Sequence, residues 1–255
     1  MKLQIKKIVA LTLITALSAG VLTLAACKGK TQDEEITEPE ETIVDDFGEA
    51  ETLSAAESLQ LKAAIEAIPN GAGTPLSQAE LDDIMNALPC VTMDWSETES
   101  YRPTPDSRFL LSHYVDVKQI SLYHFIKYFP GGETDVSDDE LRALGWDRNE
   151  HYGAILRFPA SMIRDTFLRY AGISLDDLEE DYKTVCNYLE ETDAFYVEVY
   201  DAEIVQFFAN SGERFADKIY LYGGLTIGAC GPSVLVLREN PAGGYQFVSL
   251  LPANW

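Results

Sequence analysis

The hydrophobic period of this chain changes once, after Thr192, and that change constrains the fold more than any other feature. Before Thr192, apolar residues recur every three or four positions, as in helices. After it, apolar and polar residues alternate, as in half-buried strands. The alternating segments are AFYVEVY (194–200), KIYLYGG (218–224), SVLVLRE (233–239) and YQFVSLL (245–251), and residues 240–244 form a hairpin turn between the last two. This order predicts an α+β fold, with N-terminal helices packed on a C-terminal antiparallel β-sheet of about four to five strands.

Capping residues mark the first two predicted helices. Ser77 precedes Glu80 by three residues, an arrangement in which the hydroxyl and the carboxylate satisfy each other's backbone N–H groups at a helix start. Ser54 and Glu57 have the same spacing. We therefore expect a helix after each serine, the second one ending near Leu88.

Two further helices are bounded by glycine and proline. The segment ISLYHFIKYFPGGE (120–133) predicts a short helix that ends at its Pro-Gly-Gly sequence. Ser137 and Glu140 form another capping pair, and Gly145 provides the stop. Both helices are expected to be short because their start and stop signals are close together.

The segment FPASMIRDTFLRYAGISLDDL gives the clearest local prediction. Pro159 is placed for a helix start, and Gly172 is placed for a left-handed C-terminal stop. Ser174 and Asp177 then have the spacing of a new helix start. We expect this next helix to run towards Leu189.

The first 27 residues have the layout of an export signal. Lys2, Lys6 and Lys7 precede an uncharged, largely apolar run (8–26) that ends in small residues. A run of this length is also just sufficient for a retained transmembrane helix across about 30 Å of hydrocarbon. The small residues in its centre and before Cys27 argue against that alternative.

The segment Leu24 to Cys27 (LAAC) resembles the lipobox of bacterial lipoproteins, and residues 1–27 as a whole follow the pattern of that family. The resemblance implies that Cys27 carries a thioether-linked diacylglycerol and becomes the mature N-terminus after cleavage. Two acyl chains suffice for stable membrane anchoring. The expected location is therefore extracellular, at the outer face of the cell membrane.

Residues 28–52 contain ten Asp or Glu residues and two Lys residues. A segment this acidic buries too little apolar surface to offset its chain entropy, so we expect a disordered tether. The predicted organisation is a signal peptide over 1–26, a lipidated Cys27 with its tether over 27–52, and a single globular domain over 53–255.

The net charge of −23 limits the partners. An acidic surface repels nucleic acid phosphates, so no nucleic acid partner is expected. Cation binding is a secondary hypothesis, but no Cys or His residues have the spacing of a zinc site, and we expect no metal and no cofactor. Apart from Cys27, the cysteines Cys90, Cys186 and Cys230 allow at most one internal disulfide with three possible pairings, or buried thiols.

No catalytic motif is recognisable. His113, His124 and His151 are far apart in sequence, and each is best explained as a structural residue. Nucleophile-elbow and phosphate-loop motifs are absent from the sequence. Glu198 lies in an otherwise apolar strand and is the most interesting carboxylate, although a solvent-facing position explains it more simply. We therefore predict no catalytic residue.

Tyrosines recur on the predicted strands. Strand alternation places Tyr196, Glu198 and Tyr200 on one face of their strand, and Tyr220 and Tyr222 on one face of theirs. If the aliphatic faces pack on the helices, these five candidate ligand-binding residues form a polar aromatic surface suited to a glycan or a surface protein. The alternative is that they cover the sheet or line a second core.

Residues 105–252, through ISLYHFIKYFPGGE, FPASMIRDTFLRYAGISLDDL and YQFVSLLP, resemble a helix-then-sheet domain of uncharacterised surface lipoproteins of clostridial bacteria. The resemblance implies location and architecture but no site. We expect a lipid-anchored extracellular binding or interaction module and not an enzyme. The alternatives are a carbohydrate-active hydrolase, which requires two carboxylates about 5–10 Å apart in a cleft, and a structural envelope protein.

Overall fold

A computed structural model describes residues 55–88, 91–94, 100–199, 205–225 and 231–253. Residues 51–255 form one compact unit. The predicted lipidation site at Cys27, the tether and the capping residue Ser54 lie outside the described residues.

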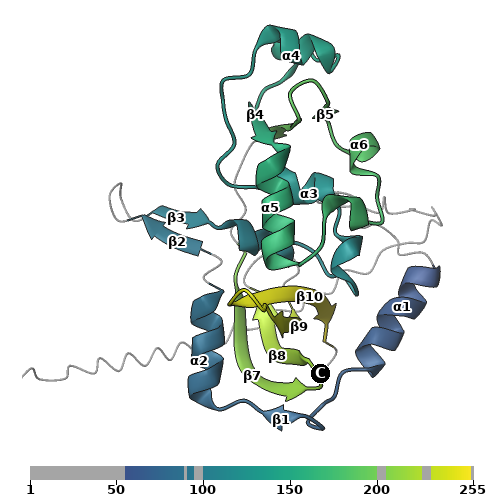
Figure 1. Ribbon diagram of the computed structural model, residues 1–255, viewed down its shortest axis with the longest axis vertical. Helices are drawn as coiled ribbons and strands as arrows, with labels where there is room; N and C mark the ends of the chain where they lie inside the picture. Colours follow the sequence, from purple (N-terminus) through teal and green to yellow (C-terminus); the bar gives the residue numbers. More distant parts are fainter. Residues whose placement is uncertain (1–54, 89–90, 95–99, 200–204, 226–230, 254–255) are drawn as a thin grey trace, which may run out of the picture. The chain divides into compact units, whose positions relative to one another are not determined.

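Helices dominate the part of the chain before the change of period (Figure 1). The α-helices are α1 (Ala55–Glu66), α2 (Gln78–Ala87), α3 (Leu122–Lys127), α4 (Asp138–Ala143), α5 (Ala160–Tyr170) and α6 (Tyr182–Val185), and short 3-10 helices span Pro105–Leu110, Val117–Gln119, Arg148–Glu150 and Leu175–Asp177. The capping boxes at Ser77 and Ser137 are both present. The predicted stop at Gly172 is confirmed, with φ of +71°.

The helix expected from Ser174 towards Leu189 is wrong. The Ser174–Asp177 pair caps only a 3-10 turn, after which Leu178 is extended. α6 is a single turn, and Tyr188–Leu189 is a strand, β5. The aromatic contacts explain the difference, because the ring of Tyr188 lies 5.2 Å from that of Phe195 and is brought there by strand pairing.

The larger sheet, sheet A, is antiparallel with the order β1-β7-β8-β9-β10, which confirms the predicted antiparallel sheet of about four to five strands, although β1 comes from the N-terminal part of the chain. Its strands are β1 (Thr74–Pro75), β7 (Phe207–Phe215), β8 (Lys218–Leu225), β9 (Pro232–Glu239) and β10 (Tyr245–Pro252). The predicted hairpin between β9 and β10 is confirmed, and its turn is closed by the Asn240 N–H donating to the Gly244 carbonyl at 2.9 Å.

The segment AFYVEVY does not join sheet A. It forms β6 (Ala194–Val199), the central strand of a separate three-stranded sheet C with β4 (Ala154–Pro159) and β5. Strand β4 was not predicted because its end, Pro159, was assigned to the following helix alone. A third sheet, sheet B, pairs β2 (Val91–Asp94) with β3 (Ser100–Pro103).

One main core lies between sheets A and C. Phe167 of α5, Leu221 of β8 and Phe195 of β6 all belong to it, and α5 contacts both β10 and β4. The opposite face of each sheet has a smaller apolar cluster under its own helix. Leu61 of α1 packs against the cluster on sheet A, and Leu141 of α4 belongs to the cluster on sheet C. Sheets A and C therefore each have one face on the main core and a smaller cluster under a helix on the other, and this arrangement determines where the tyrosines lie.

Candidate functional site

Tyr196 is fully buried on the face of sheet C that α4 covers. Its hydroxyl donates to the Glu140 carboxylate at 2.7 Å and shares a hydrogen bond with Thr192 at 2.9 Å. The Ser137 hydroxyl contributes most to lowering the pKa of Glu140 to about 2, and Tyr196 and Arg157 add to the effect. Tyr196 is therefore a structural residue and cannot form part of an outward-facing binding surface.

Glu198 is half-buried in a hydrogen-bond network on β6. The Glu198 carboxylate accepts from the Gly153 N–H at 2.7 Å and lies 2.8 Å from Nδ1 of His151. The His151 ring in turn lies 4.7 Å from the Trp146 ring. Glu198 is thus held in a local network that joins β6 to the start of β4, and Tyr200 lies outside the described residues.

Tyr220 and Tyr222 lie on the outer face of sheet A, opposite Ile219 and Leu221, as strand alternation predicts. Both are partly buried against the cluster that α1 covers. Because β6 belongs to sheet C, however, the single tyrosine surface that was expected across β6 and β8 is not formed. Tyr222 lines a cavity on this face.

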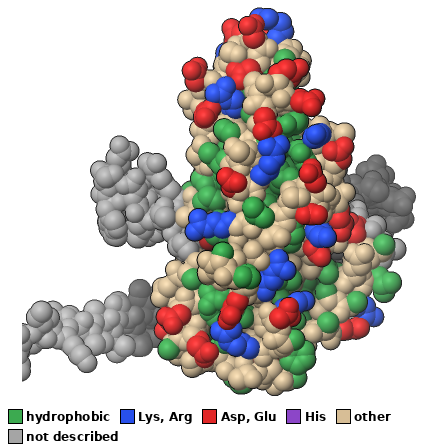
Figure 2. Space-filling model, viewed as in Figure 1, with side chains coloured by type: hydrophobic (Ala, Val, Ile, Leu, Met, Phe, Trp, Pro, Cys, Tyr) green, Lys and Arg blue, Asp and Glu red, His purple; other side chains and the backbone are tan. Residues whose placement is uncertain are grey.

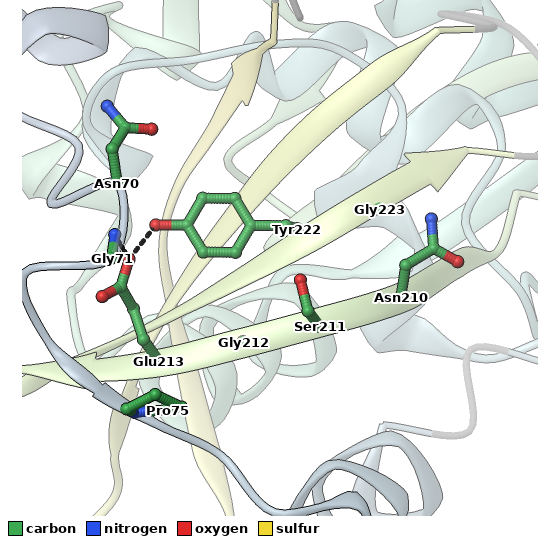
Figure 3. Close-up of a pocket in the computed structure, with 9 residues that line it drawn as sticks. All are labelled: Asn70, Gly71, Pro75, Asn210, Ser211, Gly212, Glu213, Tyr222 and Gly223. Atoms are coloured by element: carbon green, nitrogen blue, oxygen red, sulfur yellow. Dashed lines mark hydrogen bonds between the residues drawn. The ribbon is translucent and has the colours of Figure 1, made fainter.

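This cavity, the β7–β8 pocket, has a volume of about 620 Å³ (Figure 3). It lies on the outer face of sheet A, between two strands and the loop that follows α1. Its lining residues are Asn70, Gly71, Pro75, Asn210, Ser211, Gly212, Glu213, Tyr222 and Gly223. Its volume is within the range of about 300–1,000 Å³ that is usual for small-molecule sites.

Irregular backbone opens the pocket. The register between β7 and β8 shifts between Ala209 and Ser211, so Asn210 is an extra residue in a β-bulge. A side chain at Gly223 would collide with the Phe208 carbonyl oxygen, which makes glycine necessary opposite the bulge. Asn70 adopts a left-handed backbone with φ of +48°, which turns the loop after α1 back over the sheet.

A buried carboxylate holds one end of the pocket together. Glu213 is 3% exposed and accepts hydrogen bonds from the N–H groups of Gly71 at 2.9 Å and Gly73 at 2.6 Å, and from the Tyr222 hydroxyl. Burial raises the pKa of Glu213, but the hydrogen bonds outweigh it and the net pKa is lowered. Burial, followed by the contact with Glu213, raises the pKa of Tyr222. Charged Glu213 and neutral Tyr222 therefore form a fixed pair.

Sequence reasoning missed Asn210, Ser211 and Glu213. All three lie in β7, whose sequence FFANSGERF interrupts apolar alternation with Asn, Ser and Gly. That interruption is the one available signal, since polar and glycine residues inside a strand are typical of bulges. The partners Gly71 and Gly73 are about 140 residues away along the chain and give no signal of their own.

The other candidates have structural environments. His113 lies 3.2 Å from the Ser233 hydroxyl, and burial lowers its pKa. Cys186 is a free, buried thiol whose pKa is raised to about 12, chiefly by burial. Cys90 and Cys230 lie outside the described residues. Within the described residues, no group of three or more His, Cys, Asp or Glu side chains is arranged to hold a metal ion.

No family model, curated protein or solved structure shows significant similarity to the chain. Within the described residues, no helix combines the length and the hydrophobicity needed to cross a bilayer.

Proposed function

We propose that the protein is a lipid-anchored extracellular binding module whose ligand occupies the β7–β8 pocket. The anchor is supported by the LAAC segment ending at Cys27, which follows a basic and then an apolar stretch. The acidic stretch 28–52 supports a tether between the anchored residue and the compact unit over 51–255. This arrangement presents the pocket away from the outer face of the cell membrane.

The number of carboxylates in the pocket is the observation that favours binding over hydrolysis. A glycoside hydrolase needs one carboxylic acid and one carboxylate about 5–10 Å apart. Among the described residues that line the pocket, Glu213 is the only carboxylate, and it accepts three hydrogen bonds. Because these hydrogen bonds occupy the Glu213 carboxylate, we assign it the role of holding the walls of the pocket together.

Blocking the pocket tests this function. Ser211 is exposed, lies opposite Tyr222 in register and points to the same side as its ring (Figure 3), so Ser211→Trp fills the pocket without disturbing the core. Leu168→Trp, at a position 62% exposed on α5, is the matched control. The full chain in detergent is applied to arrays of neutral oligosaccharides, acidic oligosaccharides and peptides.

We expect the wild-type chain and the Leu168→Trp variant to bind the same probes, and Ser211→Trp to lose at least tenfold in affinity. If Ser211→Trp binds the probes as tightly as the wild-type chain, the assignment of the β7–β8 pocket as the binding site is contradicted. Binding to none of the three probe classes would contradict the function.

The anchor has its own test. A fatty-acid probe supplied to bacteria that express the full chain should label the wild-type protein and not Cys27→Ala. Ser112→Ala, which leaves every cysteine in place, is the control. Persistent labelling of Cys27→Ala would overturn the anchor.

A further inference from the structure

The β7–β8 pocket contains uncharged side chains that both donate and accept hydrogen bonds. Asn210 and Ser211 are exposed at its mouth, and neither side chain is hydrogen-bonded to another described residue. The Asn70 amide donates to the Ile68 carbonyl at 3.0 Å, so its oxygen still accepts. A ligand made of hydroxyl groups, which also donate and accept, complements these side chains best.

The pocket also holds one aromatic ring in a fixed position. Figure 3 shows the Tyr222 ring extending from β8 towards Gly71, with the side chains of Asn210 and Ser211 rising from β7 on the side where the ring lies. The bond from the Tyr222 hydroxyl to buried Glu213 fixes the ring before any ligand arrives. A preorganised ring loses little entropy on binding, and it offers a flat apolar surface to the C–H groups of a sugar.

The charges argue against an anionic ligand. Among the described lining residues, none is Lys or Arg, and the one ionisable acid, Glu213, is negatively charged. The whole chain carries a net charge of −23, which repels phosphates and uronic acids over short distances. On the face seen in Figure 2, acidic and basic side chains are interspersed without one large basic patch.

The sheet edge argues against a peptide that adds as a strand. Strand addition needs unused main-chain groups at an edge. Beside the pocket, β1 already pairs with β7 at Glu213 and Arg214, and the Leu76 N–H donates to the Gly212 carbonyl at 2.8 Å. From Gly212 to Arg214, the main-chain positions that an extended peptide would use are therefore occupied by the protein itself.

We infer that the β7–β8 pocket binds a neutral oligosaccharide, with one sugar ring stacked on Tyr222 and its hydroxyl groups hydrogen-bonded to Asn210 and Ser211. This inference rests on the proposed function and names its ligand class. The four β7 residues that line the pocket span about 10 Å, which accommodates more than one sugar ring.

Isothermal titration of the full chain in detergent tests the inference. The probes are four neutral tetrasaccharides (cellotetraose, chitotetraose, xylotetraose and maltotetraose), one acidic tetrasaccharide of galacturonic acid, and a peptide library. We expect at least one neutral probe to bind and the acidic probe not to bind. Tyr222→Ala should weaken that binding about tenfold, and Asn210→Ala about fivefold.

The controls separate binding from folding. Tyr152→Ala removes a tyrosine that is 93% exposed and far from the pocket in sequence, and it should leave the affinity unchanged. Asn210 is exposed, so Asn210→Ala keeps the test valid even if Tyr222→Ala fails to fold. Tyr222→Phe retains the stacking ring and should retain most of the affinity.

The outcomes also separate the two proposals. If only peptides or only the acidic probe bind, and Ser211→Trp abolishes that binding, then the sugar inference is overturned while the binding function stands. If no probe binds, both fail. If a neutral probe binds the wild-type chain, Asn210→Ala, Tyr222→Phe and Tyr222→Ala with equal affinity, the stacking site on Tyr222 is overturned.

Discussion

Sheets A and C each contain a tyrosine hydrogen-bonded to a glutamate, but the two pairs have different roles. In sheet C, Tyr196 donates its hydroxyl to Glu140, and α4 covers both strand and ring, so the tyrosine is fully buried. In sheet A, Tyr222 donates to Glu213, and α1 packs against the cluster formed by β9 and β10, while Asn210 and Ser211 of β7 are exposed. One Tyr–Glu pair closes a core, and the other borders a pocket.

The comparison shows that the cover over a strand decides the role of its residues. Both tyrosines follow the same alternation, and both strands place their aliphatic residues in the main core. The position of the covering helix differs, and so does the neighbouring strand, because β7 has a bulge at Asn210. Substitution of the tyrosine should therefore lower the free energy of unfolding more in sheet C than in sheet A. Only substitutions in sheet A should change ligand affinity.

The largest difference is expected for alanine at the two tyrosines. Tyr196→Ala should lower the free energy of unfolding by about 4 kcal/mol, because a fully buried ring is removed and a cavity remains. Tyr222→Ala should cost about half as much because its ring is only partly buried. Urea unfolding of both variants checks this, and equal losses would break the comparison.

Removal of Glu213 is expected to cost about 3 kcal/mol. Glu213→Ala leaves two backbone N–H groups and the Tyr222 hydroxyl without their acceptor in a buried place. Glu239→Ala removes another β-strand carboxylate that is exposed and paired with Arg214, and it should cost less than about 0.5 kcal/mol. A loss below about 1 kcal/mol for Glu213→Ala would show that the hydrogen bonds to Glu213 do not hold the pocket together.

The pH dependence should sharpen the comparison. The pKa of Glu140 is lowered in the folded protein to about 2 by Ser137, Tyr196 and Arg157. Its stabilisation is therefore complete above about pH 4.5 and is lost as the pH falls towards 2. Glu140→Gln should reduce the slope of stability against pH in this range by at most about 1.4 kcal/mol per pH unit. An unchanged slope in urea unfolding at pH 2–5 would contradict the charged Glu140 network.

The smallest effect is expected at a surface ion pair between α5 and the turn that precedes β6. Arg164 makes two hydrogen bonds of 2.8 Å to Asp193, but both side chains are substantially exposed. Solvent screening limits the contribution, so Arg164→Ala should lower the free energy of unfolding by about 0.5 kcal/mol. A loss above about 2 kcal/mol, measured by urea unfolding, would show that this pair belongs to the buried network of sheet C.

The sequence predicted what depends on near neighbours. The capping boxes at Ser77 and Ser137, the stop at Gly172 and the faces of β6 and β8 were all correct, because each depends on residues within one turn or one strand. The α+β class followed from the change of period alone.

The sequence could not predict what depends on distant contacts. Tyr196 is buried through Glu140, 56 residues earlier in the chain, and no local pattern shows which helix covers which strand. Strand β7 was missed because its bulge replaces apolar residues with Asn210 and Ser211. The same irregularity that concealed the strand opens the pocket, so the site is least visible where the local pattern is broken.

The most direct test of the account is a nuclear magnetic resonance titration of the 15N-labelled full chain in detergent with the neutral tetrasaccharide that binds best. We predict saturable shifts of the backbone amide signals of Asn210, Ser211 and Tyr222, and no shift at Tyr196. Shifts centred on Tyr196, or no shift with any of the four neutral tetrasaccharides, would contradict the assignment of the β7–β8 pocket as the sugar-binding site.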